Sequence, residues 1–168
     1  MNLSAQITAL QNLLVAQTWV PAGNVVFPQG SVKVTANTET AMDFALRNFR
    51  SPICLLQPLD GESDPKYDEE PDLLYENFQV RLIVNIPGDP VGTNALMGAN
   101  LTNGANASEG QGLFTLEQQL FNAIGILNAA NAITIQFRGK GNVTAGHLEN
   151  RTYLAYRDFR FQSLCTWV

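Results

Sequence analysis

The densest group of side chains that could carry out chemistry lies between Asp60 and Glu76. This segment holds eight acidic residues against one lysine, so its net charge is −7, whereas the whole chain of 168 residues carries −5. The acidic residues are Asp60, Glu62, Asp64, Asp68, Glu69, Glu70, Asp72 and Glu76. Carboxylates at this density could bind a divalent cation, contact a basic partner or repel DNA.

The spacing of the first three carboxylates resembles that of a calcium-binding loop. Asp60, Glu62 and Asp64 match the first, third and fifth positions of such a loop. Pro65, however, stands where the loop needs a glycine, and Pro71 stands where it needs a bidentate glutamate. An EF-hand is therefore excluded. Weak binding of divalent cations remains open, and a solvated acidic loop is the simpler interpretation.

No other group of residues has the spacing of a catalytic or metal centre. The chain has one histidine, His147, and two distant cysteines, Cys54 and Cys165, so it lacks the ligand pattern of a structural zinc site. The sequence contains no nucleophile elbow, phosphate-binding loop, dinucleotide fingerprint or zinc-protease motif. We expect no enzyme activity and no cofactor, and we interpret both cysteines as reduced, small apolar residues.

Arginines are interleaved with aromatic residues near the C-terminus. Arg151, Arg157 and Arg160 are interleaved with Tyr153, Tyr156, Phe159, Phe161 and Trp167. Such a pattern resembles surfaces that bind single-stranded nucleic acid, where bases stack on the rings. The net negative charge argues against this function, because a general nucleic-acid binder needs a basic patch. We interpret these aromatic side chains as core and interface.

Two helices are predicted from apolar residues spaced three or four apart, in segments 4–17 and 115–128. The apolar residues are Leu3, Ile7, Leu10 and Leu14 in the first segment, and Leu116, Leu120, Ile124 and Leu127 in the second. Ser4 is expected to cap the first helix, and Thr115 with Gln118 forms a capping box for the second. A shorter helix is predicted after Asn37 or Thr38. Its expected buried residues are Ala41, Phe44 and Ala45.

The strands are predicted from β-branched and alternating segments. Residues 25–35 indicate a strand, a turn and a strand, and residues 51–58 a short strand with Pro52 at its open edge. The strand from residue 75 places Phe78, Val80, Leu82, Val84 and Ile86 on one face. Residues 132–139 form a further strand, with Ile133, Ile135 and Phe137 on one face. A turn is expected at 139–142, and one long strand begins near residue 151.

The segment 88–112 is predicted to be a long loop rich in glycine, asparagine and alanine. It has few large apolar residues, so burial within its own chain could not offset the entropy of ordering about 25 residues at roughly 1 kcal/mol or more each. We expect this loop to be mobile in the free subunit and to order against a neighbour. Leu96, Met97 and Leu101 are the expected anchors.

These elements predict one α+β domain over residues 1–168, with long loops at 57–74 and 88–112. The expected architecture is a mostly antiparallel sheet with two or three helices packed on one face. The other face would carry Arg81 and Arg157 and remain uncovered, which suits self-association. The sequence has no apolar run long enough to span a membrane and no secretory signal, so we expect folding in a cytoplasm and no membrane partner.

The order of these elements resembles the tail terminator proteins of long-tailed bacteriophages, also called tail completion or head–tail joining proteins. The resemblance rests on a capped N-terminal helix, the long strand YENFQVRLIVNI, the helix TLEQQLFNAIGIL and the last strand RTYLAYRDFRFQSLCTWV. It implies a virion protein that forms a ring, typically of six subunits, on the end of the tail tube. The ring would stop tube growth and join the head's connector or stopper protein, while DNA passes through without sequence-specific binding.

Other functions remain open. The chain could be another neck or tail-tube component of such a particle, a small hydrolase that uses the acidic segment, or an adaptor domain whose loops bind one protein. If the ring interpretation holds, the candidate interface residues are the acidic Asp60, Glu62, Asp64, Asp68, Glu69 and Glu70, the loop anchors Leu96, Met97 and Leu101, and the two arginines Arg81 and Arg157.

Overall fold

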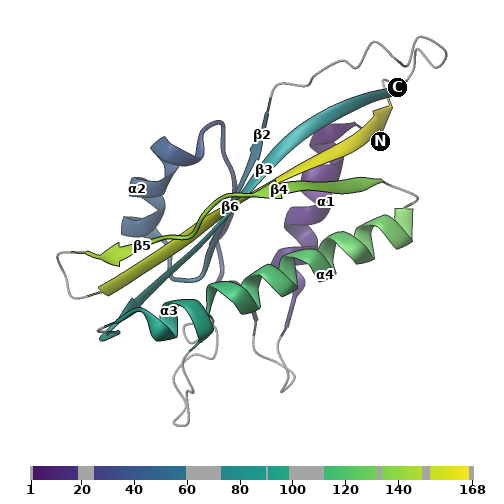
Figure 1. Ribbon diagram of the computed structural model, residues 1–168. Coiled ribbons are helices and arrows are strands. Elements are labelled where there is room, and N and C mark those ends of the chain that lie inside the picture. The colour runs from purple at the N-terminus through teal and green to yellow at the C-terminus, as the bar shows by residue number, and fades with distance from the viewer. Residues whose placement is uncertain are drawn as a thin grey trace.

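The chain forms a six-stranded sheet with helices on both faces (Figure 1). The computed structural model describes residues 2–18, 25–59, 73–89, 91–98, 112–131, 134–148 and 152–166. The strands are β1 Val32–Val34, β2 Ile53–Pro58, β3 Leu73–Pro87, β4 Ile135–Lys140, β5 Thr144–His147 and β6 Thr152–Thr166. The helices are α1 Leu3–Ala16, α2 Thr38–Asn48, α3 Thr93–Met97 and α4 Leu113–Asn131.

The strand order is β1-β2-β3-β6-β4, with β5 also paired to β6. Of these pairs, only β1–β2 is parallel, which confirms the α+β class with a mostly antiparallel sheet.

The centre of the sheet is the antiparallel pair of β3 and β6. The two strands stay in register along their whole length, from Leu73 opposite Thr166 to Pro87 opposite Thr152. Because side chains alternate along a strand, the pair presents two different faces. The predicted apolar face of β3 is confirmed, since Phe78, Val80, Leu82, Val84 and Ile86 are all buried.

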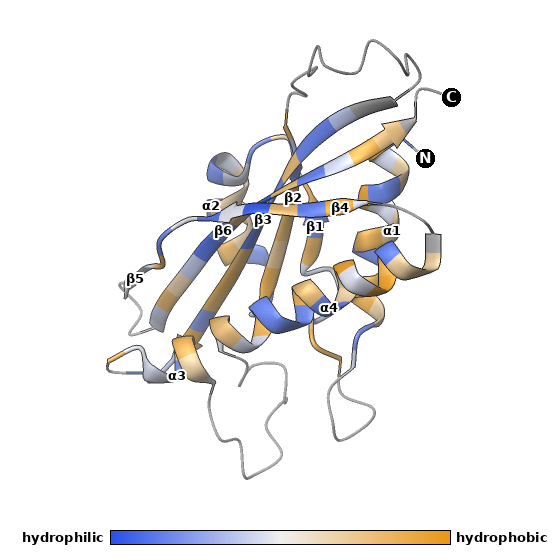
Figure 2. Cartoon of the chain, turned by 45° about the vertical axis from the view of Figure 1, so that its right-hand side comes forward, coloured by the Kyte–Doolittle hydropathy of each residue, from blue (hydrophilic) through white to orange (hydrophobic). Residues whose placement is uncertain are grey.

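Helices α1 and α4 cover that apolar face, which we call the first face (Figure 2). Both predicted apolar stripes are buried there, except that Leu3 is only partly buried. The helix starts differ from the predictions. Asn2 caps α1, because its Oδ1 accepts a hydrogen bond from the Ala5 backbone N–H at 2.9 Å. Helix α4 begins at Leu113, so Thr115 lies inside its first turn, and burial of Leu113 accounts for the earlier start.

The opposite face, which we call the second face, is partly covered by α2 (Figure 1). The predicted cap Asn37 is confirmed, since its Oδ1 accepts from the N–H groups of Glu39 and Thr40. The predicted buried stripe is only partly right. Met42 and Ala45 pack on the sheet, whereas Phe44 is 60% exposed. Helix α2 buries the apolar second-face residues of β2 and β3, which are Ile53, Leu55 and Ile83. The expectation of one uncovered face was therefore wrong where α2 packs on β2 and β3.

The strand at 51–58 is internal rather than at an edge. β2 pairs with β1 on one side and with β3 on the other, and Pro52 directly precedes it. The segment 25–35 supplies only the three-residue β1, with a turn at residues 29–30 before it. The parallel pairing of β1 and β2 is possible because α2 connects them across the second face.

The glycines at 139–142 do not reverse the chain. Strands β4 and β5 both pair with β6 and run the same way along it. The register slips by one residue at Phe137–Gly139, and again between Lys140 and Thr144, where three residues oppose two on β6. The chain reverses instead at 148–152, where the Leu148 N–H donates to the Thr152 carbonyl at 2.9 Å. Glycine favours a bulge as well as a turn, so the sequence signal was ambiguous.

The predicted loop 88–112 contains a short helix, α3, which contradicts the expectation that it lacks structure throughout. The side chain of Asp89 is buried and accepts from the Ala95 N–H at 2.8 Å. Gly92 has a φ of 77°, and a Cβ there would lie 2.3 Å from the Tyr153 ring. Residues 99–111 lie outside the described part of the chain, and so does Leu101.

Candidate functional site

Arg81 lies on the second face, as predicted, but it is buried with only 2% exposed. Its Nε and Nη2 donate to the two carboxylate oxygens of Asp158 at 2.7 and 2.8 Å. Nη2 also pairs with Glu39 of α2 at 2.5 Å, and the guanidinium stacks 4.6 Å from the centre of the Tyr156 ring. The Arg81 hydrogen bond lowers the pKa of Glu39 below its ordinary value. Arg81 therefore fastens α2 to the sheet and is not available to a partner.

Arg157 lies on the first face, so the expectation that it shares a face with Arg81 was wrong. The register explains this, because Arg157 stands opposite Leu82, whereas Arg81 stands opposite Asp158. Arg157 pairs with Glu117 of α4 at 2.5 Å, and Lys140 lies 3.5 Å from the same carboxylate. This cluster ties α4 to β6 and β4 in the way Arg81 ties α2.

The acidic candidates lie outside the described residues: Asp60, Glu62, Asp64, Asp68, Glu69 and Glu70. Within the described ranges, no group of three or more histidine, cysteine or acidic residues could hold a metal ion. Cys54 and Cys165 are buried free thiols, and burial raises the pKa of each. His147 packs edge-on against Tyr153, with ring centres 4.8 Å apart. No catalytic group emerges among these residues.

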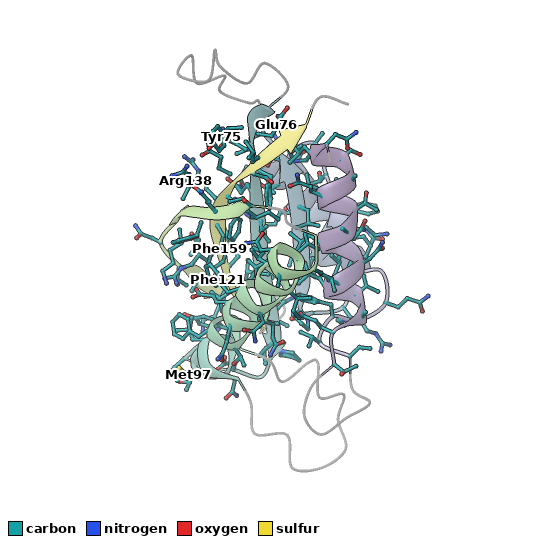
Figure 3. All side chains as sticks on the ribbon, turned by 90° about the vertical axis from the view of Figure 1, so that its right-hand side faces the viewer. Tyr75, Glu76, Met97, Phe121, Arg138 and Phe159 are labelled. Carbon is teal, nitrogen blue, oxygen red and sulfur yellow. The ribbon has the colours of Figure 1, made fainter. Side chains whose placement is uncertain are left out.

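The two loop anchors that the structure describes have different surroundings. Leu96 is partly buried and packs against the chain's own core, and its expected role as an anchor for a neighbour stays a prediction. Met97 is 65% exposed and remains available to a partner. Figure 3 shows Met97 at the opposite end of the molecule from Glu76, where β3 begins.

At one end of the sheet, β1 forms an exposed edge with an adjoining apolar groove. The groove has a volume of about 360 Å³. It is lined by Lys33, Val34, Thr35, Ala41, Phe44, Phe49 and Leu55, and we call this the β1 edge surface. The Phe44 and Phe49 rings meet edge-to-face at 5.7 Å.

The backbone of β1 also offers free hydrogen-bonding groups. Ser31 and Thr35 bond to β2, through Cys54 N–H to Ser31 O at 2.9 Å and Thr35 N–H to Leu56 O at 2.8 Å. Because alternate residues of a parallel strand point to the same neighbour, Val32 and Val34 point away from β2. Gln11 donates to the Val32 carbonyl at 2.9 Å. By this alternation, the N–H and C=O of Val34 point to the open side of β1.

At the other end of the sheet, β4 forms the second exposed edge, beside aromatic side chains of α4. Phe137 of β4 is 47% exposed and meets Phe121 of α4 at 5.2 Å between ring centres. Phe121 also contacts the buried rings of Phe159 and Phe161 (Figure 3). Phe114 lies two turns before Phe121 on the same side of α4 and is exposed. We call Phe114, Phe121 and Phe137 the β4 edge surface.

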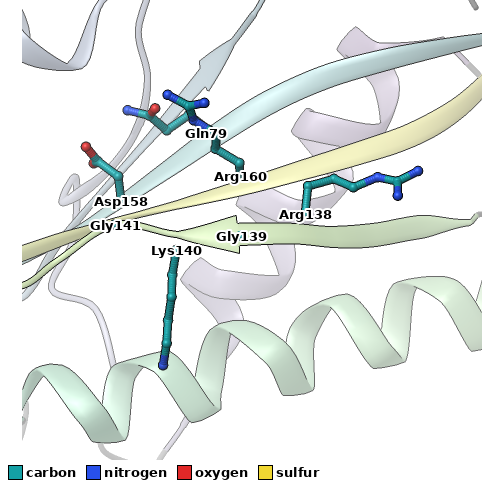
Figure 4. A pocket seen from close by; sticks show the side chains of 7 residues that line it. All are labelled: Gln79, Arg138, Gly139, Lys140, Gly141, Asp158 and Arg160. Atoms are coloured by element: carbon teal, nitrogen blue, oxygen red, sulfur yellow. The ribbon is translucent and has the colours of Figure 1, made fainter.

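A polar pocket of about 320 Å³ lies between β3, β6 and β4 (Figure 4). It is lined by Gln79, Arg138, Gly139, Lys140, Gly141, Asp158 and Arg160. Gln79 stands opposite Arg160 in the β3–β6 register, so both lie on the second face, and the Gln79 amide N–H donates to the Thr38 hydroxyl of α2 at 3.1 Å. Figure 4 shows the Lys140 side chain pointing away from this face, toward α4.

The sequence reasoning missed this pocket and both edge surfaces. Arg160 was noted only for its aromatic neighbours, and Phe44 was assigned to the core. A sheet order that places β1 and β4 at the ends comes from long-range pairing, which local patterns do not encode. In the comparisons with known proteins, no family model matches this chain, and no curated protein matches it.

Proposed function

We propose that this chain is a structural subunit that assembles head to tail with copies of itself into a closed ring. The observation that carries the proposal is that one sheet ends in two unlike exposed edges, each beside exposed apolar side chains. Exposed edges and apolar patches are features that monomeric proteins usually avoid. Two different surfaces at opposite ends of a subunit suit a heterologous contact, which closes into a ring when the rotation between subunits permits.

The chemistry of the two surfaces supports their pairing. The β1 edge surface offers a groove, the exposed ring of Phe44 and the free backbone groups of Val34. The β4 edge surface offers projecting aromatic side chains, and aromatic residues are enriched at the centres of protein interfaces. The ion pairs Arg81–Glu39 and Arg157–Glu117, which fasten α2 and α4 to the sheet, would help to hold both surfaces in place before association.

The resemblance in element order to phage tail terminators supports a position for this ring at the head-proximal end of a tail tube. In that position the subunit would end tube growth and join the tail to the head as part of the virion. Its partners would be the tail tube protein, the head connector or stopper protein and further copies of itself, with six subunits expected. The net charge of −5 supports passage of DNA without specific binding. The described helices include none with the length and hydropathy that a membrane span requires.

The assembled mass tests this proposal. Native mass spectrometry and negative-stain imaging would be carried out on the chain alone and after mixing with tail tubes. The expected result is one closed species whose mass is a whole multiple of 18.4 kDa, seen end-on as a ring capping the tube. A chain that stays monomeric at high concentration and never caps the tubes would contradict the proposal. Turnover of a hydrolysable substrate by a monomer would favour the hydrolase alternative.

A further inference from the structure

The polar pocket is cationic. Its one carboxylate belongs to Asp158, and Arg81 occupies both oxygens of that group. The Lys140 ammonium lies against Glu117 on the other face, so its charge is directed away from the pocket. Arg138 and Arg160 remain, and in the described part of the chain neither has a carboxylate within ion-pairing distance. Among the described residues, Arg138 donates a hydrogen bond to the amide oxygen of Gln162.

Two guanidinium groups beside a polar amide bind carboxylate or phosphate, because each guanidinium presents a planar fork of N–H donors. The pocket volume suits one or two acidic side chains. A nucleic acid would need a continuous basic surface, whereas this pocket also contains the carboxylate of Asp158 and belongs to a chain of net charge −5. The charge and size of the pocket therefore favour a carboxylate-rich peptide.

The chain itself contains such a peptide. Residues 60–72 hold seven acidic residues and one lysine. They connect β2, which lies next to β1 at one end of the sheet, to β3 at its centre, whereas Arg138 lies on β4 at the other end. If copies associate through these two ends, the β1–β2 end of one copy lies beside β4 of the next. Head-to-tail assembly would thus bring the acidic segment of one copy to the pocket of its neighbour.

We propose that Arg138 and Arg160 form a site for the acidic segment 60–72 of a second copy. This site rests on the head-to-tail arrangement of the proposed function and adds an electrostatic contact to it. The contact would fix the order of the subunits, because complementary charges favour one register and disfavour others. It also gives the segment a role that requires neither a metal ion nor catalysis.

A labelled peptide of residues 60–72 tests the site on single chains by fluorescence anisotropy. The receptor is the full chain with its seven carboxylates in 60–72 changed to amides, so that its own segment cannot compete. We expect saturable binding that weakens as salt is added. The double variant Arg138→Gln/Arg160→Gln should lose roughly tenfold or more in affinity, since two charge-assisted hydrogen-bonding groups are removed. The matched control Arg47→Gln/Arg50→Gln removes two exposed charges elsewhere and should stay within about twofold.

Absence of saturable binding, or equal loss in the control variant, would overturn the site. A single-stranded oligonucleotide that binds the pocket more tightly than the peptide would overturn the choice of ligand.

The wild-type chain, diluted until monomeric, should bind the peptide with the same affinity as the amide-substituted receptor. If it excludes the peptide, the segment fills the pocket of its own chain, and the second copy is ruled out. Peptide binding without rings would refute only the proposed function, and rings without peptide binding only this site.

Discussion

At the scale of single residues, two arginines connect helices α2 and α4 to the sheet through ion pairs. Arg81 and Arg157 are nearly adjacent in the pairing of β3 and β6, yet they point to opposite faces. Each meets a carboxylate from a helix on its own face, Glu39 of α2 or Glu117 of α4. The sequence predicted both arginines on one uncovered face, as candidate interface residues. It could not identify their partners, which lie about 40 positions away.

Removing Arg81 should destabilise the fold. In Arg81→Met, Asp158 and Glu39 lose their partner. Because the Asp158 side chain is 28% exposed and that of Glu39 is 71% exposed, water offsets part of the loss, and we expect a cost of about 1–3 kcal/mol. Asp158→Asn should cost more than Glu39→Gln, which should cost at most about 1 kcal/mol. Urea denaturation measures all three, and equal costs for the two carboxylates would contradict the bidentate arrangement.

The acid dependence of stability should contain a contribution from Glu39. Its pKa in the folded chain lies below the ordinary value of 4.5, chiefly because Arg81 donates a hydrogen bond to it. The contribution is therefore present above pH 4.5 and is lost as the pH falls through the lower, folded-state pKa. Wild type should lose more stability than Glu39→Gln between about pH 5 and pH 3. Parallel curves for the two proteins over that range would show that the pair contributes nothing.

At the scale of elements, the sequence predicted those parts whose pattern matches their burial. The long strand β3 and helix α4 have one apolar face each, and both bury that face as predicted. The predictions failed for residue types that occur in two different structural settings. Gly139 and Gly141 mark bulges beside β6 rather than a turn, and Phe44 is apolar but faces solvent at the groove. The cationic pocket could not be predicted, because Arg160 and Arg138 come together only through the pairing of β4 with β6.

Packing of α4 on the first face gives a direct stability prediction. Leu120 is fully buried against the sheet, so Leu120→Ala should reduce the free energy of unfolding by about 2–5 kcal/mol through lost burial and the cavity left behind. Gln118→Ala, at an exposed position in the same helix, is the control and should change it by less than about 0.5 kcal/mol. A Leu120→Ala protein as stable as the control would mean that α4 packs elsewhere.

At the scale of the whole molecule, the two ends of the sheet are unlike in shape and chemistry. The β1 edge surface is a groove beside a three-residue strand, whereas the β4 edge surface is built of projecting rings. Because the two surfaces differ, each would contact the other in a neighbouring copy, and blocking either one should leave the second intact. This property separates head-to-tail assembly from a symmetric dimer, in which one surface meets itself.

The most direct test mixes two variants, each blocked at one edge. Phe44→Asp places a charge at the β1 edge surface, and Phe137→Asp places one at the β4 edge surface. Val91→Asp, at an exposed site on neither surface, is the control and should assemble as wild type. Native mass spectrometry of each blocked variant alone should show single chains of 18.4 kDa, and their equal mixture should show dimers of one copy each and nothing larger. Dimers formed by either variant alone, a mixture that stays monomeric, or rings formed by both variants would contradict head-to-tail assembly.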